Sequence, residues 1–368
     1  MSHLRLVFLG LSLSSSWGNG HATTFRALVK ALSDRGHNVL FLERDVPWYA
    51  AHRDLSDPDF CRLAFYIDVE DLCRFRDVIA SADAVVVGSY VPDGVVVGQL
   101  VQDWARGVTA FYDIDTPVTL AKLDRGDFEY LSPELIPAYD IYFSFTGGRI
   151  LDRLVTQYGS PAARALYCSV DPRAYPRLDR EKRWDLTYLG TYSADRQPTL
   201  ERLLLEPARQ APHLRFAVAG PLYPANIQWP PNVERISHVP PTEHAEFYAR
   251  SRFTLNVTRA DMIRAGYSPS VRLFEAAACG TPIISDVWDG LDTLFVPGSE
   301  IALANGARDV LDVIGGWSDA QRDRVAAAAR QRVLTEHTAS HRARAMEASL
   351  EEADRRVGAV RILEAVNH

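Results

Sequence analysis

Short apolar runs, each about as long as a buried strand, recur along the first half of the chain, and amphipathic stretches at 21–37 and 147–159 separate several of them. The runs are LRLVFLGLS (4–12), NVLFLERD (38–45), DAVVVGSYV (83–91), VTAFYDID (108–115), DIYFSF (140–145) and ARALYCSV (163–170). Strands that alternate with helices form a mostly parallel sheet with right-handed crossovers. We therefore predict a doubly wound domain over residues 1–170.

A polar, proline-bearing segment follows and is typical of a linker, which we place at 171–184. The same alternation then resumes with DLTYLGTYS (185–193), RFAVAGP (215–221), VERISHV (233–239), FTLNVTR (253–259) and PIISD (282–286). This pattern predicts a second α/β domain over 185–340. The tail at 341–368 is rich in Ala, Arg and Glu, and we expect it to form a helix that packs back on the first domain.

Open parallel sheets bind ligands outside the carboxyl ends of their strands. The predicted architecture is therefore two doubly wound parallel-sheet (Rossmann-like) domains whose ligand-binding edges we expect to face each other across a cleft. Candidate functional residues should lie in the loops that follow the strands.

Composition narrows the possible partners. The chain has 368 residues, a formal net charge of -7 and a pI near 5.8, which argues against nucleic acid as the main partner. Its four cysteines are scattered, which fits core positions in a reducing cytoplasm better than disulfides or a zinc site. No segment approaches the roughly 20 apolar residues of a membrane span, so we expect no stable membrane insertion.

The stretch SPSVRLFEAAACGTPIISD (268–286) contains an unusual carboxylate, Glu275. Ser268 and Pro269 predict a helix start, whereas Gly280 and the proline after it predict a stop. Most of this helix is small or apolar, and a glutamate is rarely buried without a partner. We expect Glu275 to accept hydrogen bonds from vicinal hydroxyls of a ligand; an ordinary solvated glutamate is the alternative.

Free backbone amides at the start of the same helix form a candidate anion site. The N–H groups of Ser270 and Val271 have no partner within the helix, and a helix N-terminus favours negative charge. A ribose diphosphate would satisfy these amides and Glu275 together.

The loop after the first strand, SLSSSWGNGHATTF (12–25), is rich in glycine and leads into a helix. Gly20, Asn19 and His21 are candidate sugar or acceptor contacts, with His21 as a base or a sugar-binding group; a plain helix cap is the alternative. The spacing is not G-x-G-x-x-G, although the second strand ends in LERD, so NAD binding is only loosely indicated.

Asp113 and Asp115 lie at the end of a predicted strand, and Tyr90 follows the strand before it. One short Asp-x-Asp motif is a weak metal signal, and we expect no metal. Turn caps before Pro117 are one interpretation; binding of an acceptor's hydroxyls or amine by these three residues is the other.

The second domain begins with a turn through Gly190 and carries Arg196 near a helix start, where an arginine can clamp a diphosphate. Arg259 lies just ahead of the Glu275 helix and makes this side locally basic. Isolated surface arginines are the competing interpretation.

Taken together, SPSVRLFEAAACGTPIISD, YLGTYSADR and LNVTR resemble the C-terminal signature of GT-B fold glycosyltransferases, particularly the CgeB-like spore-maturation group; the likeness is most specific from about 184 to 297. The resemblance implies GT-B architecture and transfer of a hexose from a nucleoside diphosphate sugar, with UDP as the expected nucleotide, to an unknown acceptor, without a metal. It also implies that Glu275 holds the ribose and that the amides before it hold the diphosphate.

One position departs from the family's pattern. Retaining relatives carry a second glutamate eight positions before the ribose-binding one, where it touches the donor sugar, and here that position is Tyr267. A retaining outcome is favoured over an inverting one. A sugar-nucleotide epimerase of the same fold, or a catalytically silent binding partner for sugar nucleotides or glycans, remain alternatives.

Overall fold

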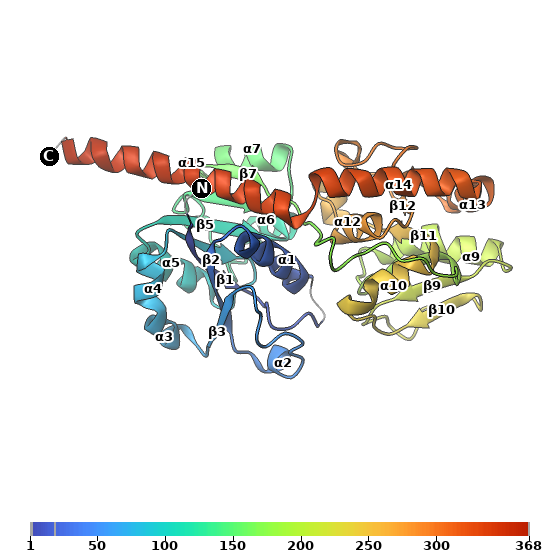
Figure 1. Ribbon diagram of the computed structural model, residues 1–368, viewed down its shortest axis with the longest axis horizontal. Coiled ribbons are helices and arrows are strands. Elements are labelled where there is room, and N and C mark those ends of the chain that lie inside the picture. Colours follow the sequence, from blue (N-terminus) through green and yellow to red (C-terminus); the bar gives the residue numbers. More distant parts are fainter. Residues whose placement is uncertain (1–2, 18–19, 367–368) are drawn as a thin grey trace. The chain divides into compact units, whose positions relative to one another are not determined.

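The computed structural model describes residues 3–17 and 20–366 (Figure 1). The chain divides into two compact units. Unit 1 comprises the chain up to Tyr167 together with the segment from Ala339 onward, and unit 2 comprises Cys168–Thr338.

Unit 1 is built on a seven-stranded parallel sheet within the described residues, in the order β3-β2-β1-β4-β5-β6-β7. Two of its central strands, β1 after its exposed first residue Arg5 and the whole of β4, are buried, and they therefore consist of apolar residues and glycine. The strands are β1 (Arg5–Gly10), β2 (Asn38–Arg44), β3 (Arg62–Tyr66), β4 (Ala84–Gly88), β5 (Val108–Asp113), β6 (Ile141–Ser144) and β7 (Ala163–Ala165).

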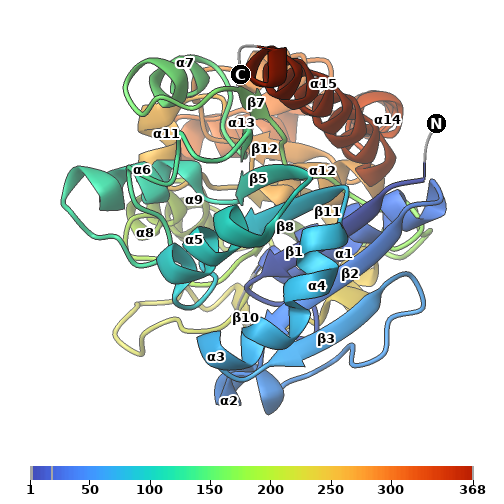
Figure 2. The same cartoon turned by 90° about the vertical axis from the view of Figure 1, so that its left-hand side faces the viewer.

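Helices connect these strands, and the chain's last helix returns to them. The last helix, α15, packs against α1, and α4 packs against α5 (Figure 2). The helices of unit 1 are α1 (His21–Asp34), α2 (Pro47–Ala50), α3 (Val69–Leu72), α4 (Arg76–Ser81), α5 (Gly94–Trp104), α6 (Thr116–Asp124), α7 (Arg149–Thr156) and α15 (Ala339–Val366).

Unit 2 contains a second parallel sheet, with six strands in the described residues in the order β10-β9-β8-β11-β12-β13. A core that includes Leu186, Phe216 and Phe253 packs on it. The strands are β8 (Trp184–Leu189), β9 (Phe216–Ala219), β10 (Val233–Ile236), β11 (Ser251–Asn256), β12 (Ile283–Ser285) and β13 (Ala302–Leu303). The helices are α8 (Gln197–Leu200), α9 (Glu206–Gln210), α10 (His244–Ala249), α11 (Ala260–Ala265), α12 (Val271–Ala278), α13 (Ala307–Gly316) and α14 (Asp319–Glu336).

Every apolar run named above contains a strand, so the doubly wound parallel architecture is confirmed. The sequence pattern missed β3 and β13. The first is an edge strand that is buried only at its last residue, and the second has two residues, so neither presents a continuous apolar run.

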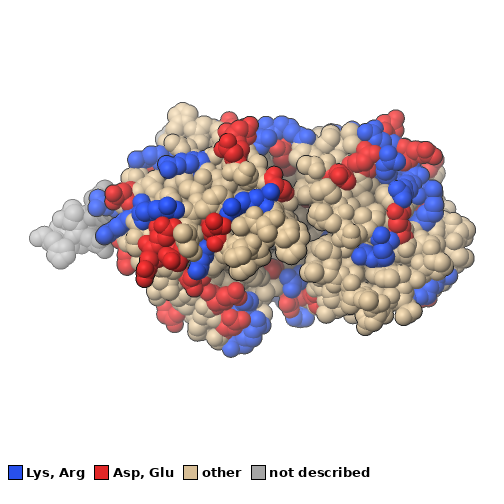
Figure 3. Space-filling model, turned by 90° about the horizontal axis from the view of Figure 1, so that it is seen from below, with Lys and Arg blue, Asp and Glu red and all other residues tan. Residues whose placement is uncertain are grey.

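Among the described residues, no helix is both long enough and apolar enough to cross a bilayer. Figure 3 shows acidic and basic side chains interspersed over one face of the molecule.

Candidate functional site

The helix that carries Glu275 begins later than predicted. α12 starts at Val271, with Ser270 in an extended conformation before it, so the predicted start at Ser268 and Pro269 was wrong. The restriction on a residue before proline suits a helix cap and an extended segment alike, so it does not decide where the helix begins. The predicted end is confirmed, because Gly280 has φ +70 just after the last turn.

Ser270 does not cap α12 with its side chain. Its hydroxyl donates instead to the Oδ1 of Asn256, 2.7 Å away at the end of β11. This bond fixes the first turn of α12 against the carboxyl edge of the sheet. The amide groups of Ser270 and Val271 are thereby held at the helix N-terminus, where an anion is favoured.

Arg272 is a site residue that the sequence did not reveal. It is 7% exposed, and its Nε donates to the carbonyl oxygen of Leu189 at 2.5 Å. Its Nη1 donates to Asn256 Oδ1 at 3.2 Å, and its guanidinium lies 4.6 Å from the centroid of the Tyr188 ring. Arg272 thus ties the ends of β8 and β11 to the start of α12 and brings a positive charge to that corner.

Gly190 is required by this packing. A Cβ atom there would lie 2.7 Å from the Nη2 of Arg272 and 2.7 Å from the Tyr188 hydroxyl oxygen. A Cβ on Gly220, which has φ +141, would lie 2.1 Å from the carbonyl oxygen of Gly190. The backbone after β8 therefore approaches the next loop more closely than any side chain would allow.

Arg196 and Arg259 both lie beside Asp195. The Nε of Arg259 lies 3.5 Å from Asp195 Oδ2, and the Nη2 of Arg196 donates to the carbonyl oxygen of Thr191 at 3.1 Å. Burial opposes ionisation of Asp195, but a hydrogen bond from Ser193 and the charges of the two arginines outweigh it and lower the pKa of Asp195. The predicted basic side of the site therefore contains an acid that pairs with Arg259.

Glu275 is 4% exposed and has partners from within unit 2. Its Oε1 accepts a hydrogen bond of 2.7 Å from the Tyr175 hydroxyl, and its Oε2 accepts one of 3.4 Å from the Tyr248 hydroxyl. The Nδ1 of His244 lies 3.8 Å from Oε2. These phenols explain how the carboxylate is tolerated in an apolar helix. A carboxylate has about four acceptor positions, so capacity for ligand hydroxyls remains.

Tyr267, at the position that departs from the family's pattern, has a left-handed backbone with φ +48. Its N–H donates to the carbonyl oxygen of Asp289 at 2.6 Å, and its ring packs on Gly290, where a Cβ would lie 2.4 Å from the ring. A non-glycine residue in this region is strained, and such strain is concentrated at functional sites.

In unit 1, His21 is the first residue of α1, and the imidazole packs edge-on against Tyr90 with 5.1 Å between ring centroids. Its Nδ1 is buried and has no hydrogen-bond partner in the described residues. Burial lowers the pKa of His21 to about 4, so the ring is neutral at pH 7. A Cβ on Gly20 would meet nothing within 4 Å, whereas Asn19 lies outside the described residues.

Tyr90 and Asp115 are joined directly. The Tyr90 hydroxyl donates to Asp115 Oδ2 at 3.0 Å, and its ring lies 4.6 Å from that of Tyr130. Tyr90 has φ +63, which turns the chain sharply after β4. Burial, together with the charge of Asp115, raises the pKa of Tyr90 far above its ordinary value, so the phenol stays protonated and donates.

Asp113, the last residue of β5, is fully buried. It accepts hydrogen bonds from the Tyr142 hydroxyl (2.5 Å), the Thr119 hydroxyl (2.8 Å) and the Asp115 N–H (3.1 Å). Burial raises its pKa to about 6 despite these bonds. Asp113 therefore fixes the backbone of Asp115. Among the described residues, no group of acids, histidines or cysteines has the arrangement of a metal site.

The LERD segment at the end of β2 loosely indicated NAD binding, but its glutamate, Glu43, binds the loop after β1 instead. Glu43 is fully buried and accepts hydrogen bonds from the N–H groups of Leu13 (2.6 Å) and Ser14 (2.8 Å). A dinucleotide-binding acid must face the ribose of its ligand. Because Glu43 is enclosed by the first loop, it does not serve that purpose.

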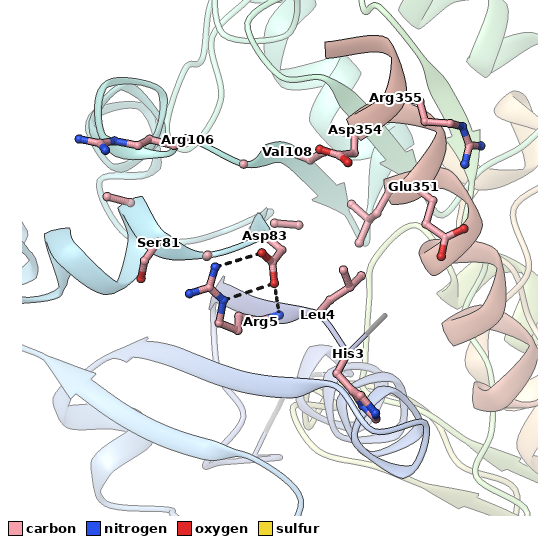
Figure 4. A pocket seen from close by; sticks show the side chains of 15 residues that line it. His3, Leu4, Arg5, Ser81, Asp83, Arg106, Val108, Glu351, Asp354 and Arg355 are labelled. Carbon is pink, nitrogen blue, oxygen red and sulfur yellow. Dashed lines mark hydrogen bonds and ion pairs between the residues drawn. The ribbon is translucent and has the colours of Figure 1, made fainter. Parts of the chain in front are cut away.

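A cavity of about 620 Å³ lies at the opposite edge of the unit 1 sheet (Figure 4). Leu4 and Val108, near the amino ends of β1 and β5, line it together with Glu351 of α15, and Arg5 pairs with Asp83 at its wall. None of the predicted site residues belongs to this cavity. The residues argued above lie at or after the carboxyl ends of their strands, where ligands of such sheets bind.

Comparison with known proteins agrees with this layout. Residues 196–348 match a family described as glycosyl transferase-like. No curated protein sequence matches the chain. The family match and the two parallel-sheet units together support an enzyme of the glycosyltransferase type with GT-B architecture.

Solved structures share the fold at low sequence identity. A sucrose-phosphate synthase from Thermosynechococcus elongatus matches with 14% identity and a TM-score of 0.70, covering 95% of this chain and 98% of that one. Anabaena HepE, solved with UDP and glucose, matches with 11% identity and a TM-score of 0.69 over 95% and 100% of the two chains. An α-glucosyltransferase in complex with UDP-glucose and DNA matches with 14% identity and a TM-score of 0.71 over the same shares.

Proposed function

We propose that this protein transfers a hexose from a UDP-linked sugar to an acceptor bound by unit 1, without a metal ion, and that it is a CgeB-like glycosyltransferase. The observation that carries the proposal is the corner where Arg272 joins β8, β11 and the N-terminus of α12. Two fixed amides, a buried cation and a glycine that permits close approach suit a diphosphate there. The UDP and glucose bound in HepE and the UDP-glucose bound in the α-glucosyltransferase support this choice of ligand.

The departing UDP carries the charge that develops during transfer, so its stabilisation is the main task of unit 2. The α12 amides and Arg272 are already oriented without ligand, while Arg196 and Arg259 add positive charge nearby. Glu275 would accept hydrogen bonds from the ribose hydroxyls while its carboxylate continues to accept those from Tyr175 and Tyr248. Preorganised charges of this kind can replace a bound cation.

His21 would contact the sugar or the acceptor rather than act as a strong base. A general base is most effective when its pKa lies near the working pH, and the pKa of His21 is about 4. A retaining reaction, in which the leaving phosphate itself accepts the acceptor's proton, needs no such base. We therefore favour retention, with Tyr90 and Asp115 binding the acceptor's hydroxyls or amine.

Two other functions would use the same nucleotide site. An epimerase would alter the sugar of the nucleotide and need no acceptor, and a silent binding protein would leave the nucleotide sugar intact. The hydroxyl and carboxylate groups gathered around Tyr90 favour an acceptor and hence transfer.

A panel of nucleotide sugars distinguishes the three. The protein is incubated with each donor, with and without EDTA, while free nucleoside diphosphate, sugar epimer and binding are measured. We expect stabilisation by UDP-sugars and acceptor-dependent release of UDP that persists in EDTA. Formation of an epimer without UDP, or binding with neither product, would replace the proposal with the corresponding alternative.

A further inference from the structure

The loop after β1 presents an exposed tryptophan in a fixed orientation. Trp17 is 46% exposed, and its indole stacks on the imidazole of His52 with 4.4 Å between ring centroids and 18° between ring planes. The His52 Nδ1–H donates to the carbonyl oxygen of Trp48, 2.9 Å away, and Trp48 is itself 54% exposed. We call the stacked Trp17 and His52 rings the indole platform.

Hydrogen bonds, several of them buried, hold the described part of the loop that leads to Trp17. The fully buried carboxylate of Glu43 accepts two backbone N–H bonds, and the Ser14 hydroxyl donates to it as well, at 2.6 Å. Further along the loop, the N–H of Trp17 donates to the Ser15 hydroxyl at 3.3 Å. An aromatic side chain on such a loop loses little conformational entropy when a ligand covers it.

The same loop is tied to the segment that carries His52. The Ser15 hydroxyl donates to the carbonyl oxygen of His52 at 2.8 Å, and the Ser16 hydroxyl donates to Asp54 at 2.5 Å. Arg26 pairs with Asp54 at 2.5 Å. Both rings of the indole platform therefore stand on segments that are hydrogen-bonded to each other.

We propose that the indole platform binds one pyranose ring of an oligosaccharide acceptor. A pyranose has a flat face of C–H groups that an indole covers well, and a polar edge of hydroxyls. Asp45, which is 41% exposed and pairs with Arg53, can bind those hydroxyls. Asp54 already accepts four hydrogen bonds from Ser16 and Arg26, so it contributes a fixed charge instead. A purely apolar ligand would remove water from these ion pairs and would offer no hydrogen bonds in place of those lost with the water.

The position of the indole platform also sets the length of the acceptor, an inference that rests on the proposed function. Trp17 precedes His21 by four residues, so their Cα atoms are at most about 14 Å apart. Because Trp17 packs on His52 whereas His21 packs on Tyr90, the two side chains belong to separate ring clusters, and one short oligosaccharide could contact both. The site selects acceptors of two or more rings over monosaccharides.

The test uses the full chain and a glycan array of hexose, N-acetylhexosamine and uronic-acid oligosaccharides of one to six rings, followed by calorimetric titration of the best series. Wild type, Trp17→Ala and Trp17→Phe are compared, with Val155→Ala as the control because Val155 is also exposed, at 44%, and lies on α7. UDP affinity is measured for every variant.

We expect wild type to prefer oligosaccharides to their monosaccharide by about tenfold or more, which corresponds to ~1.4 kcal/mol. Trp17→Ala should abolish this preference, Trp17→Phe should retain most of it, and UDP affinity should stay unchanged in both variants. An unaltered preference in Trp17→Ala, or no glycan bound more tightly than its monosaccharide, would each overturn the proposal. A wild-type protein that does not bind UDP would instead refute the proposed function.

Discussion

The Nε of Arg272 donates to the carbonyl oxygen of Leu189 across 2.5 Å, which links the first turn of α12 to the end of β8. These residues are 83 positions apart in the chain, and the bond is buried. It therefore positions two loops of the proposed diphosphate site with one charged group. A neutral side chain could not replace both the bond and the charge.

We accordingly expect Arg272→Gln to weaken UDP binding by about 1.5 to 3 kcal/mol, the range for losing hydrogen bonds to a charged group. Arg272→Lys should restore only part of the loss, because lysine cannot contact Leu189 and Asn256 with one planar fork. Calorimetric titration with UDP measures the effect, and circular dichroism checks the fold. Arg264→Gln is the control, since the Arg264 side chain is 70% exposed. Equal affinities for Arg272→Gln and the control would contradict the assignment.

For Glu275, the prediction concerns the ribose specifically. Wild type should bind UDP more tightly than 2′-deoxy-UDP or 3′-deoxy-UDP, because the carboxylate accepts hydrogen bonds from the ribose hydroxyls. Glu275→Gln should reduce that discrimination by about 1 to 3 kcal/mol in free energy.

Tyr175→Phe separates this ligand role from a structural one. Removing the phenol should lower the free energy of unfolding, since it deletes the 2.7 Å bond to Glu275, while leaving the preference for ribose over deoxyribose in place. Glu243→Gln is the control for the loss of one carboxylate, because Glu243 is exposed. Discrimination that survives in Glu275→Gln would mean that the tyrosines alone account for the buried carboxylate.

Asp113 should make stability depend on pH. Its pKa is about 6 in the folded protein and near 3.9 in an unfolded chain, so the native state holds the proton more tightly. Its contribution to stability is complete below about pH 4 and is lost as the pH rises through 6. The free energy of unfolding of wild type, relative to Asp113→Asn, should fall by about 1 to 3 kcal/mol between pH 4.5 and 7.5.

Urea unfolding of both proteins at several pH values measures this difference, and Asp103→Asn, on α5, corrects for general charge effects. A difference that is constant with pH, or that grows as pH rises, would show that Asp113 is ionised throughout the range.

The sequence predicted what depends on local pattern and missed what depends on distant contacts. Apolar runs located the buried strands, and Gly280 marked the end of α12. Arg272 and Tyr175 were missed because their partners lie 83 and 100 residues away, so no local spacing reveals them. The start of α12 was predicted too early, at Ser268, because a residue before a proline fits a helix cap and an extended segment equally well. The hydrogen bond from Ser270 to Asn256, which holds the first turn in place, is a contact that local spacing does not reveal.

The final prediction concerns His21 and the stereochemical outcome. Because the pKa of His21 is about 4, its ring is neutral from pH 6 to 8, and its titration should leave turnover flat over that range. We expect retention of the anomeric configuration, which NMR of the product reports directly. Because the ring is placed against the sugar or the acceptor and not as a base, His21→Ala should weaken binding of the intact UDP-sugar and lower turnover by about tenfold, which corresponds to ~1.4 kcal/mol. His21→Gln, which keeps a hydrogen-bonding side chain, should recover part of the donor affinity. An inverted product together with an essential group titrating between pH 6 and 8 that disappears in His21→Ala would establish His21 as the base instead, whereas normal turnover and donor affinity in His21→Ala would remove it from the site.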